Sequence, residues 1–214
     1  PVDCLAVNRE FPARGLGTEV DTLLLVGGRF TTIGALPIAY FGLWNGTSWN
    51  IPSGGPLNGA VYTFLENGGG WALGGAFTQF GATPSKYLVS VDLNLNQFFA
   101  SGTNLNGAVR SIAFQNSPVV GVLAGEFTLL NADPRLRVFS ITTGAMGNGF
   151  SARVRTVVLY AGLVFAGGDF LFSGVNSLVG LGKFDLALGG QWSSVQGGVN
   201  GAVWALKEFG NELW

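Results

Sequence analysis

The chain has 214 residues, of which 48% are hydrophobic and 11% are charged, and its formal net charge is −1 at pH 7. So few charges give no basic surface for nucleic acid or an anionic membrane, and no apolar run reaches the roughly 20 residues of a membrane-spanning helix. The chain also contains no histidine, the usual general base and the commonest transition-metal ligand. Composition therefore predicts no nucleic-acid partner, no membrane insertion, no metal and no cofactor.

Two motifs divide the chain into repeats. The first, Gly-Gly-x-Phe-Thr or a close variant, begins at Gly27, Gly74, Ala124 and Gly167, with spacings of 47, 50 and 43 residues. The second, Asn-Gly-Ala-Val, begins at Asn58, Asn106 and Asn200, with a degenerate copy at Ser151. Because the two motifs keep the same phase, we interpret them as one structural repeat.

Each repeat contains segments typical of four short strands. The first strands begin at a valine, over residues 61–64, 109–112, 154–157 and 203–206. The second strands are apolar runs that enter the glycine pair, such as 23–26 and 163–166, and their continuous apolarity suits burial on both faces. The third strands end in a polar residue, over 41–45, 88–92 and 181–185, and the fourth open on an aromatic residue: Trp49, Phe98 or Trp192. Between the third and fourth strands of the first repeat, Asn45-Gly46 predicts a hairpin turn.

Four strands in some 43 to 50 residues match the blade of a β-propeller. We therefore predict an all-β chain, a β-propeller of four-stranded antiparallel blades with four complete repeats and the first part of a fifth. The predicted blades of this single region, 1–214, are residues 1–57, 58–105, 106–150, 151–199 and 200–214. Other repeat folds are the alternative, although a simple β-solenoid has a shorter period.

The two ends of the repeat series differ from its middle. The first repeat is predicted to carry an insertion of about 12 residues between Asn8 and Asp21. In the fifth repeat, Val203 predicts a glycine pair near position 216, beyond Trp214. We expect an incomplete ring with an open edge, as a fragment of a longer propeller or as a unit completed by another copy.

The glycine pairs and the segment Trp44-Asn45-Gly46-Thr47-Ser48-Trp49 resemble kelch-like β-propeller repeats. The closest variant carries Gly-Gly-x-Phe-Thr followed by Trp-Asp-Gly and a further Trp, and occurs in bacterial secreted and surface proteins and in fungal cortical polarity-marker proteins. The resemblance covers essentially the whole chain but lacks the regularly placed Tyr and Trp of standard kelch repeats. It implies an extracellular or surface scaffold and carries over no catalytic residues.

The second residue of the first strand is the candidate binding position. Its neighbours are nearly constant, whereas the position itself is occupied by Asp3, Tyr62, Arg110, Arg155 and Trp204. First strands line the central channel of a propeller, so these side chains are candidates for binding an anionic or sugar-like ligand. The alternative is that these side chains bind no ligand and vary because they face a solvent-filled channel.

Other candidates have simple structural interpretations. The glycine pairs lack the helix start of a phosphate loop, so we expect them to allow close strand packing. The strand-end positions Asn45, Asp92, Ser140 and Asp185 are expected to bond to turn backbone rather than to bind Ca²⁺. The residue between Gly and Phe also varies: Arg29, Ala76, Glu126 and Asp169. Cys4 is expected to be a small core residue.

These features favour a non-enzymatic extracellular or cell-surface scaffold that binds a protein partner or further copies of the same chain. The alternative is a glycan-binding propeller, in which exposed aromatic rings stack on sugars. Its candidate residues are Trp44, Trp49, Trp192 and Trp204. An enzyme is not expected, because no acid–base pair is visible.

Overall fold

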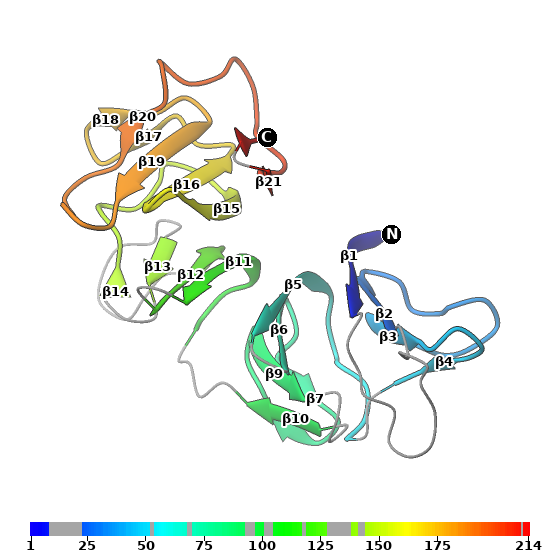
Figure 1. Ribbon diagram of the computed structural model, residues 1–214. Coiled ribbons are helices and arrows are strands. Elements are labelled where there is room, and N and C mark those ends of the chain that lie inside the picture. The colour runs from blue at the N-terminus through cyan, green and yellow to red at the C-terminus, as the bar shows by residue number, and fades with distance from the viewer. Residues whose placement is uncertain are drawn as a thin grey trace. The chain divides into compact units, whose positions relative to one another are not determined.

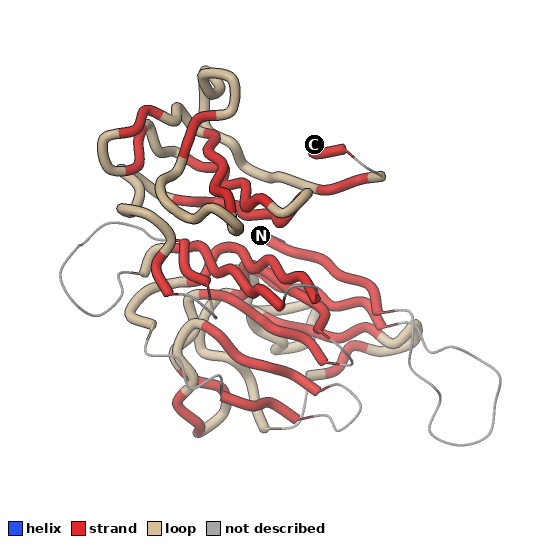
Figure 2. The backbone as a smooth tube through the Cα atoms, turned by 60° about the vertical axis from the view of Figure 1, so that its left-hand side comes forward, coloured by secondary structure: helices blue, strands red, loops and turns tan. Residues whose placement is uncertain are grey.

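The computed structural model describes residues 1–8, 23–51, 54–67, 70–92, 97–100, 105–116, 119–127, 138–140, 144–210 and 212–214. These residues form strands, turns and loops without a helix (Figure 2), so the all-β prediction is confirmed for them. None of the described segments is therefore a helix with the length and apolarity to cross a bilayer. The predicted insertion between Asn8 and Asp21 lies outside the described residues. Contacts divide the chain into two compact units, Pro1–Thr103 and Asn104–Trp214, which are described separately.

The first unit contains two four-stranded antiparallel sheets (Figure 1). Sheet I has the strands β1 (Val2–Asn8), β2 (Leu23–Gly28), β3 (Phe41–Trp44) and β4 (Trp49–Asn50). Sheet II has the strands β5 (Val61–Asn67), β6 (Gly70–Gly75), β9 (Leu88–Asp92) and β10 (Gln97–Ala100). A small hairpin, β7 (Gln79–Phe80) and β8 (Thr83–Pro84), connects β6 to β9.

The second unit repeats this arrangement. Sheet III has the strands β11 (Val109–Asn116), β12 (Val119–Gly125), β13 (Val138–Ser140) and β14 (Gly144–Ala145). Sheet IV has the strands β15 (Val154–Tyr160), β16 (Leu163–Gly168), β19 (Leu181–Asp185) and β20 (Ser193–Ser194). Two hairpins complete it: β17 (Phe172–Ser173) with β18 (Asn176–Ser177), and β21 (Glu208–Phe209) with β22 (Glu212–Leu213). In all four sheets the strands follow one another in chain order, so each predicted repeat forms one sheet.

The same register joins the first two strands of every sheet. The first valine lies opposite the second glycine of the pair: Val2 with Gly28, Val61 with Gly75, Val109 with Gly125 and Val154 with Gly168. One residue later the register shifts, so that the second residue of each first strand has no partner across the ladder. This is the geometry of a β-bulge, which re-aims one side chain. The candidate binding position is thus a recurring bulge.

The second glycine is required because a backbone carbonyl fills the space of a side chain. At Gly75, Gly125 and Gly168 an added Cβ would overlap the carbonyl oxygen of the residue before the first strand. In sheet IV that oxygen, on Arg153, accepts a hydrogen bond from the Asp169 N–H at 2.9 Å, and corresponding bonds occur in the other three sheets. The glycine pair is therefore a close-packing device, as the sequence predicted, and the bond locks the strand end.

The loop that follows the glycine pair is held by the first residue of the second motif. The Asn58 Oδ1 accepts hydrogen bonds from the N–H groups of Thr78 and Gln79 at 2.8 and 3.0 Å. In sheet IV the Ser151 Oγ accepts equivalent bonds from Leu171 and Phe172 at 2.9 and 3.2 Å. The degenerate motif at Ser151 thus retains the hydrogen-bonding role of the asparagine.

Replacing the Ser151 hydroxyl tests this role. We expect Ser151→Ala to lower the free energy of unfolding by about 1 kcal/mol, because two backbone N–H groups lose their acceptor. Ser151→Asn restores the residue used in sheet II and should recover most of that loss. Thermal denaturation followed by circular dichroism measures both variants. Equal stability of Ser151→Ala and the parent chain would contradict the assignment.

Successive sheets are linked through the third residue of the first strand. In the second unit, Ser111 Oγ of β11 accepts a hydrogen bond from the Val157 N–H of β15 at 3.1 Å. In the first unit, the Cys4 thiol of β1 donates to the Val61 carbonyl of β5 at 3.6 Å. The first strands of neighbouring sheets therefore lie side by side within each unit.

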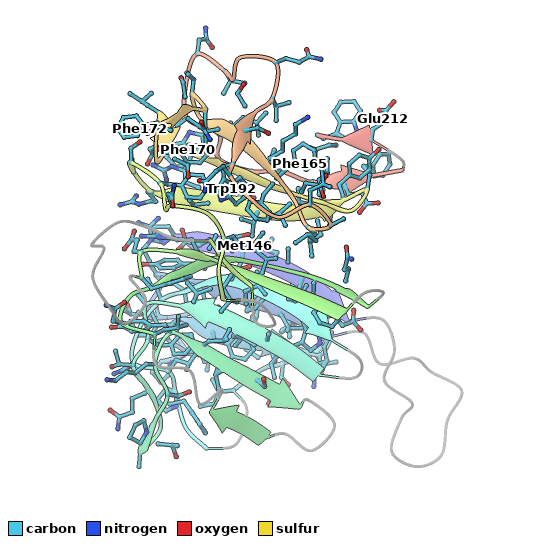
Figure 3. The ribbon with its side chains drawn as sticks, turned by 90° about the vertical axis from the view of Figure 1, so that its left-hand side faces the viewer. Met146, Phe165, Phe170, Phe172, Trp192 and Glu212 are labelled. Carbon is cyan, nitrogen blue, oxygen red and sulfur yellow. The ribbon has the colours of Figure 1, made fainter. Side chains whose placement is uncertain are left out.

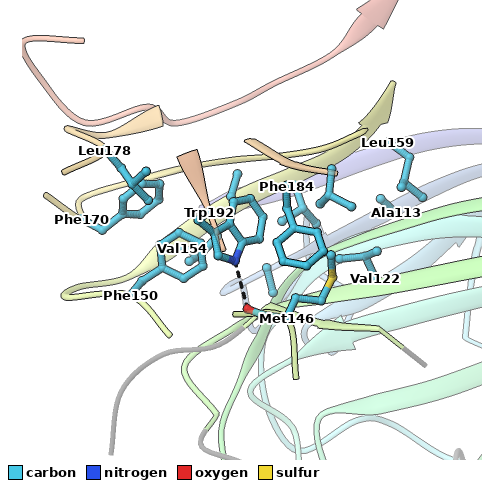
Figure 4. Packing of buried hydrophobic residues seen from close by; sticks show 14 residues of the cluster. Ala113, Val122, Met146, Phe150, Val154, Leu159, Phe170, Leu178, Phe184 and Trp192 are labelled. Atoms are coloured by element: carbon cyan, nitrogen blue, oxygen red, sulfur yellow. Dashed lines mark hydrogen bonds between the residues drawn. The ribbon is translucent and has the colours of Figure 1, made fainter. Parts of the chain in front are cut away.

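Each unit has one hydrophobic core shared by its two sheets. In the second unit, Trp192 is fully buried, and its ring meets those of Phe150 and Phe184 at centroid distances of 4.9 and 5.5 Å. Its Nε1–H donates a hydrogen bond of 2.9 Å to the Met146 carbonyl (Figure 4). Figure 3 shows Phe170 and Trp192 in the same core region of this unit. In the second unit, the aromatic residue just before the fourth strand of sheet IV is thus the centre of the core.

The backbone before the third strand adopts a left-handed conformation that the sequence did not predict. Tyr40 and Tyr87 both have φ of 66°, and Gly180 has φ of 78°. The N–H of each bonds to the carbonyl of the motif phenylalanine, and the carbonyl of each accepts from the N–H of the second glycine. These paired bonds hold tyrosine in a region that favours glycine.

Candidate functional site

The bulge residues form ion pairs with the variable residue that follows the glycine pair. In sheet I, Asp3 accepts two hydrogen bonds from Arg29, at 2.9 and 3.1 Å, which raise the pKa of the arginine above its usual value. Sheet IV has the opposite polarity, with Arg155 Nε 2.8 Å from the Asp169 carboxylate. The register explains the pairing, because the bulge turns its side chain toward the end of the second strand. The bulge position and the position between Gly and Phe, both variable in sequence, therefore form one paired site in these sheets.

In the second unit these pairs merge into a cluster that spans sheets III and IV. The Glu126 carboxylate contacts Arg110 within its own sheet at 2.6 Å and Arg153 of the following repeat at 2.9 Å. Arg153 and Arg155 flank Val154 at the start of β15, and Arg155 pairs with Asp169. Three arginines and two carboxylates leave a net charge of +1 in the cluster.

Trp204 extends this cluster. The Arg155 guanidinium lies over the Trp204 ring, 3.7 Å from its centroid, which is a cation–π geometry. The tryptophan is nevertheless 70% exposed. The cluster thus presents an exposed aromatic surface beside partly buried charges.

The structure brings three of the five candidate residues into this cluster. Arg110, Arg155 and Trp204 belong to it, whereas Asp3 and Tyr62 lie in the other unit. In sheets III and IV the arginines at the position of Asp3, Arg110 and Arg155, already pair with carboxylates, so an incoming anion would compete with existing ion pairs. A sugar would not need to displace an ion pair, because it is uncharged and could stack on the exposed ring of Trp204.

Arg153, which links the two sheets through Glu126, was not among the residues predicted from the sequence. A signal was present, because Arg153 stands where the other repeats have Ala60, Ala108 and Ala202. A charged residue at a position that is proline in the first repeat and alanine in three others indicates a specific partner. The pairing itself required the tertiary structure, since 27 positions separate Arg153 from Glu126.

Beside this cluster lies a segment that we call the apolar edge, formed by the described residues 199–210 and 212–214. Its exposed members include Trp204, Phe209 and Trp214. Val199 is 37% exposed, whereas its counterparts Leu57, Leu105 and Phe150 are 4%, 4% and 1% exposed. A pocket of about 330 Å³ lies here, lined in part by Phe170, Val199, Asn200 and Gly201. At the position of Val199 this edge thus exposes an apolar side chain that the other repeats bury.

The predicted strand over 203–206 is wrong as secondary structure. These residues are not a strand, and among the described residues they have no partner across a ladder. The Val203 N–H bonds to the Gly168 carbonyl and the Leu206 N–H to Thr156 Oγ1, each at 3.2 Å. The segment therefore lies against sheet IV as a first strand does, but a strand requires a second chain segment beside it.

Strand-end polar residues bond to turns, as predicted, at the two positions whose side chains are described. Asn45 Oδ1 accepts from the N–H groups of Thr47 and Ser48, and Asp185 Oδ1 accepts from those of Ala187 and Leu188. The side chains of Asp92 and Ser140 lie outside the described residues. Within the described part of the chain, no group of three or more metal-ligating residues occurs.

Cys4 is a half-buried thiol rather than a reactive one. Burial, together with the nearby charge of Asp3, raises the pKa of the Cys4 thiol well above its usual value. Because only the thiolate is nucleophilic, the folded protein holds Cys4 in its inert form.

This pKa shift predicts both reactivity and pH dependence. We expect alkylation of Cys4 by iodoacetamide at pH 8.5 to be at least about 10-fold slower in the folded chain than in urea. In the unfolded chain the thiol loses its proton near pH 8.5, whereas the folded chain keeps it. Stability should therefore fall as pH rises above about 8.5. Mass spectrometry and pH-dependent denaturation measure these effects, with Cys4→Ser as the control that removes both.

Fold and site together define a class of protein, an all-β chain of repeated four-stranded antiparallel sheets. Ion pairs stabilise the strand ends, and side chains such as Asn58 hold the loops by hydrogen bonds to their backbone. Comparison with known proteins finds no matching family model and no matching curated protein.

Proposed function

We propose that the chain is a kelch-like β-propeller segment that acts as a non-enzymatic scaffold or recognition module, outside the cell or at its surface. Each four-stranded sheet would be one blade of the propeller. The module would bind a protein partner or further copies of the same chain.

The repeated architecture supports this proposal. Four sheets share one register, one bulge and one glycine-carbonyl contact, and the first strands of neighbouring sheets pack side by side within each unit. Radial repetition of four-stranded sheets is the way propellers are built. Most of the charged side chains near the bulges are paired with one another, which suits a structural role.

The single observation that carries the binding role is the apolar edge at residues 199–214. Trp204, Phe209 and Trp214 expose 70%, 75% and 69% of their surfaces. Large apolar side chains exposed in this number within one short segment favour a site of association. Aromatic residues are also enriched among the residues that dominate binding energies at interfaces.

Sedimentation velocity tests the proposal. We expect the chain to associate with increasing concentration, and we expect the triple variant Trp204→Ser/Phe209→Ser/Trp214→Ser to sediment as a monomer. The exposed residues Val175 and Leu188 lie outside this edge, and Val175→Ser/Leu188→Ser is the matched control, which should associate like the parent. A parent chain that stays monomeric at all concentrations would overturn self-association through this edge.

Glycan binding is the second candidate, and the exposed face of Trp204 beside Arg155 favours it. Two other candidates from the sequence are less suited: Trp44 and Trp49 pack on each other at 5.3 Å. Trp192 is fully buried and cannot stack on a sugar. A glycan array should show hits that Trp204→Ala abolishes, and an array without hits would exclude this function for the glycans tested.

A further inference from the structure

The hairpin turn between β3 and β4 consists of residues 45–48, which are all exposed (Figure 1). The two strands pair at its base, where the Asn45 N–H bonds to the Ser48 carbonyl at 3.2 Å. Gly46 has φ of 93°, and a Cβ there would meet nothing within 4 Å. Among the described residues, the turn is therefore fixed at its base and has open space at its tip.

The Asn45 side chain uses only one of its two polar atoms in this turn. Its Oδ1 accepts hydrogen bonds from the N–H groups of Thr47 and Ser48 at 3.0 and 2.8 Å, and from their hydroxyls at 3.0 and 3.3 Å. Backbone N–H groups only donate, so the atom that faces them is the amide oxygen. Within the described part of the chain, no hydrogen bond involves Asn45 Nδ2. The turn thus holds the amide by its oxygen alone.

The corresponding turn of sheet IV shows which of these groups the turn needs. There Asp185 Oδ1 accepts hydrogen bonds from the N–H groups of Ala187 and Leu188 at 2.8 and 3.0 Å. A side-chain oxygen at the first position and two N–H groups are therefore sufficient for this turn. Because aspartate stands at the position of Asn45 and alanine at that of Thr47, neither an amide nitrogen nor a hydroxyl is required. In sheet I these two groups exceed what the turn needs.

The two additional groups together form the acceptor pattern for N-linked glycosylation, Asn-x-Ser/Thr with x other than proline. Residues 45–47, Asn-Gly-Thr, are the only place in the 214-residue sequence where Ser or Thr follows Asn at this distance. The pattern coincides with an exposed turn, where an attached glycan extends into solvent.

We propose that Asn45 is a glycosylation site, which receives an oligosaccharide from a lipid-linked donor when the chain is exported. This inference rests on the extracellular location in the proposed function. Asn45 Nδ2 attacks the anomeric carbon of the donor sugar, and a C–N bond forms while the bond from that carbon to the lipid phosphate breaks. The phosphate leaves with the bonding electron pair, and one amide proton passes to a base of the transferase.

The product of this reaction is compatible with the turn. A glycosylated asparagine keeps its carbonyl oxygen, so all four hydrogen bonds to Asn45 Oδ1 are retained. The sugar is attached at Nδ2, which has no partner to lose among the described residues. The hairpin therefore accommodates the glycan without rearrangement.

Secretion of the full chain from a eukaryotic cell line, with an added leader, tests the site. We expect the purified chain to lose mass when it is treated with peptide N-glycosidase. Enzymatic release converts asparagine to aspartate, so release in heavy-oxygen water should label position 45 and no other asparagine position. The label distinguishes glycan release from spontaneous deamidation of the Asn-Gly pair, which a digestion without the enzyme measures. A secreted chain without a glycan at position 45 would overturn the inference.

Substitutions at Thr47 separate the glycan from the turn. Thr47→Ala removes the hydroxyl but keeps both N–H groups, as Ala187 does in sheet IV, so we expect loss of the glycan from a chain with an unchanged circular dichroism spectrum. Thr47→Ser keeps the hydroxyl and should keep the glycan. The matched control is Asn148→Gln, which should also keep it, because Asn148 is an exposed asparagine before glycine with no hydroxyl two residues on. A glycan that survives Thr47→Ala would contradict the assignment.

The result at Asn45 is independent of self-association through the apolar edge. A secreted chain that lacks the glycan but still associates overturns the glycosylation site and leaves the proposed scaffold role standing. A glycosylated chain that stays monomeric at all concentrations overturns self-association and leaves the glycosylation site standing.

Discussion

We expect Trp192→Ala to lower the free energy of unfolding of the second unit by about 4 kcal/mol. The indole is fully buried, contacts Phe150 and Phe184, and donates a hydrogen bond to the Met146 carbonyl. Truncation removes these contacts and leaves a cavity between sheets that share one core. Calorimetry and urea denaturation followed by far-ultraviolet circular dichroism measure the effect, and neither depends on the fluorescence of the deleted residue.

The matched control for this prediction is Trp192→Phe, which keeps an aromatic ring in the core but loses the Nε1–H donor. We expect a smaller loss of about 1 to 2 kcal/mol, because the Met146 carbonyl is left without its donor. A loss below about 1 kcal/mol for Trp192→Ala would contradict the central place of this residue in the core.

The second large effect is expected for Gly168→Ala. Its Cβ would overlap the Arg153 carbonyl oxygen, which accepts the Asp169 N–H, and neither backbone group can move without breaking the strand end. We expect a loss of about 3 kcal/mol, as in strongly overpacked sites. In a chain of this size that loss lowers the melting temperature by roughly 6 to 12 °C, which thermal denaturation resolves.

The control for Gly168→Ala is Gly201→Ala. A Cβ on Gly201 meets nothing within 4 Å, and its backbone is outside the left-handed region, so we expect a change within about 0.5 kcal/mol. Similar losses at the two positions would mean that glycine is needed at Gly168 for a reason other than the carbonyl contact.

Much of the fold could be predicted because the repeat imposes the same local pattern several times. The glycine pair, the valine of the first strand and the polar end of the third strand each recur, so an error at one copy is corrected by the others. The strands β3, β9 and β19 begin at the predicted residues for this reason. The tertiary structure also confirmed Ser151 as a functional copy of Asn58, although the two residues differ in sequence.

The candidate site was predictable by position but not by chemistry. Variation at Asp3, Arg110 and Arg155 marked the bulge, and variation at Arg29, Glu126 and Asp169 marked its neighbour. The sequence did not reveal that the two residues of each pair neutralise each other's charge. In sheet I the bulge residue is the acid, and in sheet IV it is the arginine. Residues 14 to 26 positions apart become partners only when the hairpin register places them together.

The sequence by itself determined the all-β class, the repeat length and the first three strands of most repeats, because hydrophobic periodicity and glycine placement act over a few residues. Only the tertiary structure decided the bulge, the ion pairs and the left-handed conformation of Tyr40 and Tyr87, because each depends on backbone groups brought from distant positions. The same distinction explains residues 203–206. Their sequence is that of a strand, but a strand forms only beside a partner, and among the described residues these four have none.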